Sequence, residues 1–308
     1  MKETNLQTIL SQYLTFCEKQ KCLDEKTIKA YRIDLTQFCR QINVDQPTQI
    51  TSNMLEAYVI TLHQSFKPKT VKRKIASIKA FFHYLEYRDI LQMNPFHKIQ
   101  LRFREPVILP KTIPLPTIEL FLSEIYRTYN IAANPHQKHY ILRDIAVSEL
   151  LFATGIRISE LCALHPTDVN LADQSILIYG KGNKERRLQI GTDAVLSILI
   201  QYDQEFHTEI QQCGHFFVNQ CGRPLSDQSV RRMINKYASQ AAIEQHITPH
   251  MFRHTFATSL LEADVDIRYI QEMLGHSSIN ITQIYTHVAL SKQRDILTNK
   301  HPRKDFQI

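Results

Sequence analysis

The chain has 308 residues, of which 43% are hydrophobic and 22% charged, and this composition supports one large or two ordinary globular domains. The first residues are too polar for a signal peptide, and no apolar run approaches the roughly 18 residues of a membrane helix, so we expect a soluble, cytoplasmic protein without a membrane partner. Six cysteines without a CxxC pair predict reduced, buried thiols, and Cys213, His215 and Cys221 lack the paired spacing of a zinc site.

The net charge of +7 is unevenly distributed along the chain. Residues 1–110 contain 17 basic and 10 acidic side chains, whereas residues 111–308 contain 20 of each. A basic surface confined to the first third predicts an anionic polymer as partner. A solvated basic face that keeps the protein soluble explains the charge equally well.

Residues 1–97 are predicted to form a helical domain. Apolar positions recur at helical spacing in four segments, which are residues 6–19, 25–42, 52–64 and 70–91. Asp24 is the predicted N-cap of the second helix, and Thr51 or Ser52 that of the third. The last of these helices, which starts near Lys67, has two faces of different chemistry. An apolar stripe predicts packing inside the domain, and the opposite face suits a phosphate backbone because it carries Lys69, Lys72, Arg73 and Lys79.

Residues 98–116 have no helical period and contain four of the 12 prolines, so we expect an extended linker there. A second, mostly helical domain is then expected over residues 117–308. It contains one predicted β-hairpin, formed by residues 175–180 and 185–190, and a further predicted helix over residues 225–238.

One arginine lies at a predicted joint between two helices. The first helix is expected to end near Thr154, because Gly155 suits the left-handed residue that follows a helix, and Ser159 is expected to cap the next one. Arg157 then precedes a helix N-terminus, where free N–H groups favour anions. The alternative is a surface ion pair between Arg157 and Glu160, which would contribute little.

A second basic pair is expected at the start of another helix, with Thr248 as N-cap and Pro249 as first helical residue. His250 and Arg253 then lie three residues apart on one face. Cations at this end oppose the helix dipole, and a docked anion offsets that cost. The alternative for His250 is a hydrogen-bonded histidine in a packed interface.

The tip of the predicted hairpin carries Lys181 between two glycines. A mobile lysine can deliver a proton to a leaving oxygen, although a lysine at such a tip is usually only solvated. Lys184, Arg186 and Arg187 follow closely, so the pattern does not single out one basic residue.

Taken in order, five motifs resemble those of the tyrosine recombinase (phage integrase) family: ATGIRISEL, GKGNKER, HMFRHTFAT, LGHSSI and IYTH. Two earlier segments, TIKAYRIDLTQF and TVKRKIASIKAFFHYL, resemble its N-terminal core-binding domain. Length and spacing resemble the compact Xer-like branch, whose motifs are shared by the integrases of mobile elements.

The resemblance implies a role for each matching residue. Arg157 and Arg253 match the arginine pair that clamps the scissile phosphate, and His276 matches a His or Trp position that contacts it. Glu160 matches an acidic residue that supports the site.

The nucleophile and the proton transfers are implied in the same way. Tyr285 matches the nucleophile, a position that in isolation would be interpreted as a packing residue. Lys181 matches the lysine that protonates the leaving 5′-oxygen, and His250 matches a histidine that assists proton transfer at the nucleophile. The division of proton transfer between Lys181 and His250 stays open.

The implied fold is mainly α-helical. A SAM-like core-binding domain and a larger α+β, mostly α, catalytic domain with a small antiparallel sheet would close around DNA as a C-shaped clamp. The chain beyond Val288 resembles an exchanged tail that docks on a neighbouring protomer. The residues expected to contact DNA are Lys69, Thr70, Lys72, Arg73, Lys79, Arg231 and Arg232.

The implied partners are duplex DNA with a roughly palindromic core site and three further protomers, either of this chain or of a paralogous recombinase. A DNA translocase or accessory protein is a further implied partner, and neither a metal nor another cofactor is implied. The resemblance leaves dimer resolution and mobile-element integration or excision both open. Two other functions compete with recombination: relaxation of DNA by a type IB topoisomerase, and DNA binding without catalysis.

Overall fold

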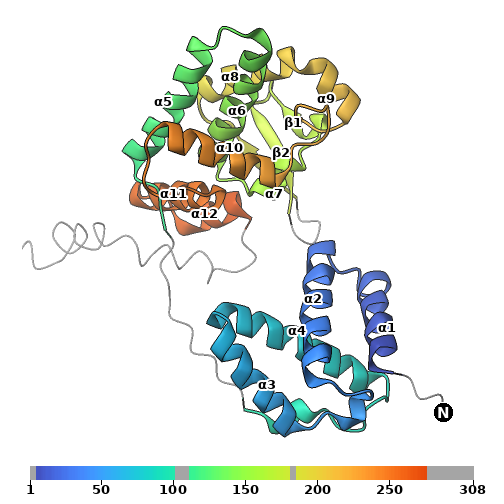
Figure 1. Ribbon diagram of the computed structural model, residues 1–308. Coiled ribbons are helices and arrows are strands. Elements are labelled where there is room, and N and C mark those ends of the chain that lie inside the picture. Colours follow the sequence, from blue (N-terminus) through green and yellow to red (C-terminus); the bar gives the residue numbers. More distant parts are fainter. Residues whose placement is uncertain (1–4, 101–110, 181–184, 276–308) are drawn as a thin grey trace, which may run out of the picture. The chain divides into compact units, whose positions relative to one another are not determined.

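The computed structural model describes residues 5–100, 111–180 and 185–275 (Figure 1). The chain divides into two compact units, residues 1–107 and 108–308, and each has its own hydrophobic core. The described part is mainly α-helical with one small antiparallel sheet, as the sequence predicts. None of its helices is both long enough and apolar enough to cross a membrane.

The first unit is built from helices only. Its elements are α1 (Leu6–Lys19), α2 (Glu25–Ile42), η1 (Pro47–Gln49), α3 (Ser52–Ser65), α4 (Pro68–Tyr87) and η2 (Pro95–Lys98). The predicted N-caps are present, because Asp24 accepts from the Lys26 N–H at 2.8 Å and Thr51 accepts from the Met54 N–H at 3.3 Å. The prediction that the fourth helix reaches residue 91 is wrong. The chain leaves the helix there because Asp89 adopts a left-handed φ of 55°.

A buried charge cluster joins α2 to α4. Asp34 is fully buried on α2 and accepts hydrogen bonds from three side chains of α4: Lys74 at 3.1 Å, Ser77 at 3.0 Å, and Arg73. The Lys74 ammonium also donates to Gln37 at 2.6 Å. A charge buried at the helix interface is thus paired and hydrogen-bonded, as burial of an ion requires.

Asp34→Asn is expected to destabilise the first unit by about 3 kcal/mol or more, because the buried Lys74 ammonium loses its counter-ion. Peptide-level hydrogen exchange, which follows each unit separately, measures the change in α2 and α4. Asp45→Asn, the same change at an exposed position, is the control. Equal protection in the two variants would contradict the role given to the buried pair.

The second unit combines helices with the sheet. Its elements are α5 (Leu115–Ile131), α6 (Pro135–Thr154), α7 (Ile158–Cys162), η3 (Pro166–Asp168), β1 (Val169–Asn170), β2 (Ser175–Tyr179), β3 (Glu185–Gln189), α8 (Asp193–Glu205), α9 (His207–Cys213), α10 (Asp227–Gln240), α11 (Pro249–Glu262) and α12 (Ile267–Leu274). Helix α6 contacts α5, α8 and α11 and is buried over most of its length (Figure 1). A helix covered on several sides needs no single apolar stripe.

The sheet has the antiparallel order β1-β2-β3. The predicted hairpin is present, with Tyr179 opposite Glu185 and Ser175 opposite Gln189. Strand β1 was not predicted from the sequence, because two residues are too few to show an alternating pattern.

The C-terminal end of the expected linker belongs to the second unit. Helix α5 begins at Leu115, inside the segment expected to be extended. Ile113 is buried, and its N–H donates to the Thr255 hydroxyl at 2.8 Å, while that hydroxyl lies 3.3 Å from the Ile113 carbonyl. This attachment to α11 is a tertiary contact between residues that are remote in the sequence, so the periodicity of apolar residues does not predict it.

The six cysteines all lie in the described segments, and none of them forms a disulfide bond. Three of them are buried, but Cys22 and Cys221 are exposed, so the expectation of buried thiols is wrong for those two.

Candidate active site

The site begins where α6 ends. Gly155 follows the helix with a left-handed φ of 59°, and its N–H donates to the Leu151 carbonyl at 3.2 Å. A Cβ at this position would lie 2.5 Å from the Phe256 ring and 3.2 Å from Leu274. Only glycine therefore allows both the turn and the close approach of α11 and α12.

Arg157 follows this turn as the N-cap residue of α7. Its N–H donates to Glu160 Oε2 at 3.0 Å, and its Nη1 donates to Oε1 at 2.7 Å. The capping oxygen is thus the Glu160 carboxylate, and the prediction that Ser159 caps this helix is wrong. The Arg157–Glu160 pair exists, but it is not a surface pair, because the Glu160 side chain is only 7% exposed.

Arg186 approaches the same carboxylate from β3. Its Nη1 and Nη2 donate to the two Glu160 oxygens at 3.1 and 2.7 Å. Burial alone would raise the pKa of Glu160, but the hydrogen bonds and charge of Arg186, together with the bonds from Arg157, outweigh burial and lower it. The carboxylate therefore stays ionised between two guanidinium groups.

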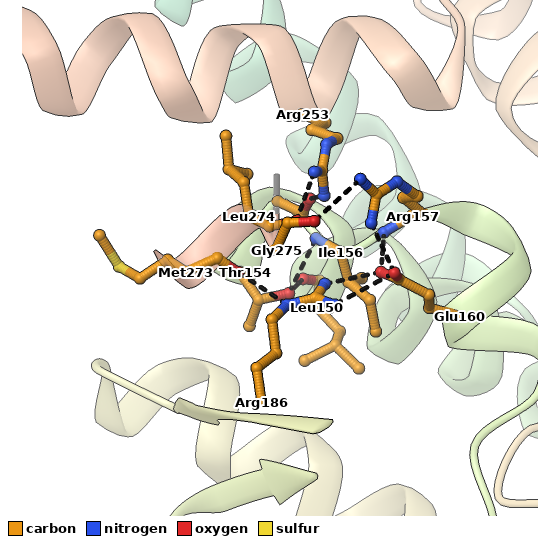
Figure 2. A network of polar contacts seen from close by, with 11 residues as sticks. Leu150, Thr154, Ile156, Arg157, Glu160, Arg186, Arg253, Met273, Leu274 and Gly275 are labelled. Atoms are coloured by element: carbon orange, nitrogen blue, oxygen red, sulfur yellow. Dashed lines mark hydrogen bonds and ion pairs between the residues drawn. The ribbon is translucent and has the colours of Figure 1, made fainter. Parts of the chain in front are cut away.

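Arg253 reaches the site from α11. Its side chain is buried, with Nη1 donating to the Gly155 carbonyl at 2.8 Å and Nη2 to the Leu274 carbonyl at 2.6 Å. The Gly275 carbonyl, one residue further, accepts from Arg157 Nη2 at 3.4 Å. The guanidinium groups of Arg157 and Arg253 thus meet at the C-terminal end of α12 (Figure 2).

The two residues of the His-x-x-Arg motif lie in different surroundings. Both are in the first turns of α11, with Thr248 at the N-cap and Pro249 first in the helix as predicted. His250 is exposed, whereas Arg253 extends inward. The neighbouring His254 is a poor cation, because burial lowers its pKa to about 4.

Three of the predicted site residues, Lys181, His276 and Tyr285, lie outside the described residues, as does the predicted tail beyond Val288. Strand β3 follows Lys181 after a few residues, and α12 ends two residues before His276. The described site thus consists of Arg157, Glu160 and Arg253, with His250 on the same helix as Arg253.

Sequence reasoning did not assign a role to Arg186. Arg186 belongs to the motif GKGNKER, but Lys184 and Arg187 lie within two positions of it, and no periodic pattern distinguishes one of these basic residues from the others. The distinguishing contacts are to Glu160 and Met273, which are remote in sequence.

The predicted DNA-contacting residues lie on two helices, one in each unit. On α4, Lys69 and Lys72 are exposed and Thr70 is partly buried. The Lys79 ammonium lies 5.7 Å from the centre of the Phe96 ring. The charge of Arg73 is partly committed to Asp34, which the helical pattern did not indicate.

On α10, which spans the predicted helix with a shift of two residues, Arg232 is exposed and Arg231 partly buried. Among the described residues, no three His, Cys, Asp or Glu side chains gather in a way that could hold a metal ion. The chemistry expected of this site relies on guanidinium groups.

Gly155→Ala tests how much the site depends on the turn after α6. The left-handed backbone costs about 1–2 kcal/mol for alanine, and the clash with Phe256 adds about 1–3 kcal/mol. Gly214→Ala is the matched control, because that glycine has a φ of 70° but nothing within 4 Å of the added Cβ. Chemical denaturation should show a larger loss of stability for Gly155→Ala, and equal losses would argue against the close approach.

Family profiles match most of the chain. The phage integrase family matches residues 122–292, and the phage integrase N-terminal SAM-like domain matches residues 10–89. The chain therefore belongs to the phage integrase family of tyrosine recombinases, which cut and rejoin DNA strands.

Similar full-length proteins support the same assignment. A tyrosine recombinase of Agathobacter rectalis is 68% identical over 302 residues, which cover 98% of this chain and 99% of that protein. The tyrosine recombinase XerD of Halalkalibacterium halodurans is 34% identical over 303 residues, covering 96% and 97%. The predicted resemblance to the Xer-like branch is confirmed.

Solved structures share the fold. The XerH site-specific recombinase bound to palindromic difH substrate, in a post-cleavage complex, has a TM-score of 0.75 at 22% identity and covers 94% of this chain and 84% of its own. A lambda integrase tetramer bound to a Holliday junction has a TM-score of 0.68 at 16% identity, with coverage of 92% and 78%. These similarities confirm the predicted fold class.

Proposed function

We propose that this chain is an Xer-like site-specific recombinase that cuts and rejoins duplex DNA through a 3′-phosphotyrosine intermediate on Tyr285. The observation that carries the proposal is the meeting of two guanidinium groups, those of Arg157 and Arg253, at the end of α12. In the sequence, His276 follows this end directly and Tyr285 lies nine residues beyond His276. Membership of the phage integrase family also supports the proposal, because the motifs that carry these residues occur in the order expected of that family.

The residue types suit phosphoryl transfer. A phosphodiester under attack accumulates negative charge on its non-bridging oxygens, and two guanidinium groups hold those oxygens in a fixed fork better than lysines would. The Glu160 carboxylate orients Arg157 by accepting hydrogen bonds from the Arg157 guanidinium and from the Arg157 backbone N–H. Arg253 is held between two carbonyls, so its position requires little reorganisation during the reaction.

In the proposed reaction, the Tyr285 hydroxyl oxygen attacks the scissile phosphorus and the bond to the 5′-oxygen breaks. Lys181 donates a proton to that leaving oxygen, His250 assists removal of the tyrosine proton, and His276 contacts the phosphate. The phosphotyrosine keeps the energy of the broken bond, so a 5′-hydroxyl of another strand can reverse the step and release the tyrosine. Water as nucleophile would instead leave a permanent break.

The proposed substrate is a roughly palindromic core site bound by four protomers, two on each DNA site. The exposed cations on α4 and α10 are the proposed phosphate contacts, which fix position rather than sequence. The other protomers are proposed to be copies of this chain or of a paralogous recombinase. A DNA translocase or accessory protein is a further proposed partner. We propose that the protein acts in the cytoplasm, where its DNA substrate lies. The genomic position of the site would distinguish dimer resolution from mobile-element recombination.

Covalent trapping tests the proposal. The protein is mixed with fragmented genomic DNA of its host, denatured and captured, and the attached DNA is sequenced. One enriched, roughly palindromic site supports recombination, and its genomic position separates a chromosomal role from that of a mobile element.

Two other outcomes would overturn the proposal. Adducts spread evenly over all sequences, together with relaxation of supercoiled DNA lacking any enriched site, would favour a type IB topoisomerase. DNA binding without any adduct, also in the presence of host extract to supply a partner recombinase, would favour a binding protein without catalysis.

A further inference from the structure

Arg186 connects two parts of the site that are far apart in the sequence. Its Nη1 and Nη2 hold both oxygens of Glu160, at 3.1 and 2.7 Å, and its Nε donates to the Met273 carbonyl at 2.9 Å. Figure 2 shows the side chain reaching from β3 toward these two partners. A single guanidinium thus links β3, the start of α7 and the end of α12.

The link is buried and closely fitted. The side chains of Arg186 and Glu160 are 9% and 7% exposed. A Cβ at Gly275 would lie 2.9 Å from Arg186 Nη1 and 3.1 Å from its Cδ. The glycine that ends α12 with a φ of 62° therefore also leaves room for the Arg186 side chain to pass.

We propose that Arg186 is a positioning residue for the phosphoryl transfer, which holds Glu160 against Arg157 and fixes the end of α12 relative to β3. This inference rests on the proposed function. The group it would position directly is Arg157, and its other contacts tie together β3 and the end of α12, which adjoin the described limits of the chain at residues 185 and 275.

The chemistry of the link requires arginine. A guanidinium has donors in a planar fork and can serve a carboxylate and a separate carbonyl at once. A lysine at this position keeps the positive charge beside Glu160 but presents a single nitrogen, so it cannot hold both oxygens and the Met273 carbonyl in this geometry. Arg186→Lys therefore preserves the charge balance of the buried pair while removing the geometric link.

The experiment uses the full chain and a nicked DNA substrate carrying the site recovered by covalent trapping. We expect Arg186→Lys to slow single-turnover formation of the covalent adduct at saturating DNA by about 10- to 100-fold, because small displacements of catalytic groups are costly. The Kd for the same DNA should stay close to that of the wild type, and the Tm should fall no further than in a variant that exchanges a buried arginine elsewhere. A slower rate of adduct formation with an unchanged Kd distinguishes a positioning role from a general loss of folding, which would also weaken DNA binding.

Arg143→Lys is the matched control. Arg143 is also buried, donates to a carboxylate, Asp144, at 2.7 Å, and to a main-chain carbonyl, Val218, at 3.3 Å, but it lies outside the site. Its replacement should leave the cleavage rate of folded protein unchanged. An equal loss of rate in both variants would show that the effect is not specific to Arg186.

The failures of the two proposals are distinguishable. If covalent trapping recovers no adduct from the wild type, also in the presence of host extract, the proposed function fails. If the wild type forms adduct and Arg186→Lys matches its rate, the positioning role is wrong and the recombinase assignment stands. Should Arg186→Lys be unfolded, the double variant Arg186→Met with Glu160→Gln removes the buried charges together, which is often tolerated. A folded double variant that binds DNA and cleaves at the wild-type rate would also overturn the role.

Discussion

Replacing Tyr285 by phenylalanine is expected to abolish the covalent protein–DNA adduct. The substitution removes one oxygen atom, and that oxygen is the proposed nucleophile, so no phosphotyrosine can form. DNA affinity should change little, because the proposed phosphate contacts come from arginine and lysine side chains. Denaturing gel electrophoresis of protein bound to labelled DNA measures the adduct, and a gel-shift assay measures binding.

Tyr269→Phe provides the matched control, since Tyr269 is an exposed tyrosine on α12 at 65% exposure. It should form adduct at the wild-type rate. Persistence of the adduct in Tyr285→Phe would assign the nucleophile to another residue, and peptide mapping of the attached DNA would identify it.

The second large effect is expected for Arg253→Lys. The variant keeps a positive charge but loses the fork that spans Gly155 and Leu274 and that we propose to hold the phosphate. Loss of one such donor lowers the rate of related reactions by about 10²- to 10³-fold. Single-turnover cleavage at saturating DNA measures the change, and we expect most of it in the rate rather than in Kd.

Stability has to be followed in the same variant, because two buried carbonyls lose a partner. The Arg143→Lys protein again reports the effect of exchanging a buried arginine elsewhere. A variant with normal Tm, normal DNA binding and wild-type cleavage would rule out Arg253 as a phosphate ligand.

Sequence reasoning succeeded where structure is determined locally. The starts of α2 and α3 were predicted from capping residues, and the end of α6 from a glycine whose φ of 59° few other residues adopt. These features depend on residues within one turn of each other. The order of the family motifs suggested the residues of the candidate site, of which Arg157, Glu160 and Arg253 lie close together among the described residues.

Contacts between remote elements were not predictable in the same way. Arg157 and Glu160 were correctly paired as neighbours, but the same carboxylate also binds Arg186, 26 positions further along the chain, and this contact was not predicted. Lys74 adjoins the predicted basic face of the fourth helix and was given no role, yet it is buried against Asp34, 40 positions away. Helical periodicity places a residue on a face and does not show what covers that face.

The attachment of Ile113 to Thr255 has a mechanical consequence. Thr255 is two residues from Arg253 on α11, and its hydroxyl lies within 3.3 Å of both the N–H and the carbonyl of Ile113. The segment that enters the second unit from the first is therefore fastened beside the helix of the proposed phosphate ligand. These contacts attach Ile113 to the helix that carries Arg253, the proposed phosphate ligand, so a displacement of Ile113 would act first on α11.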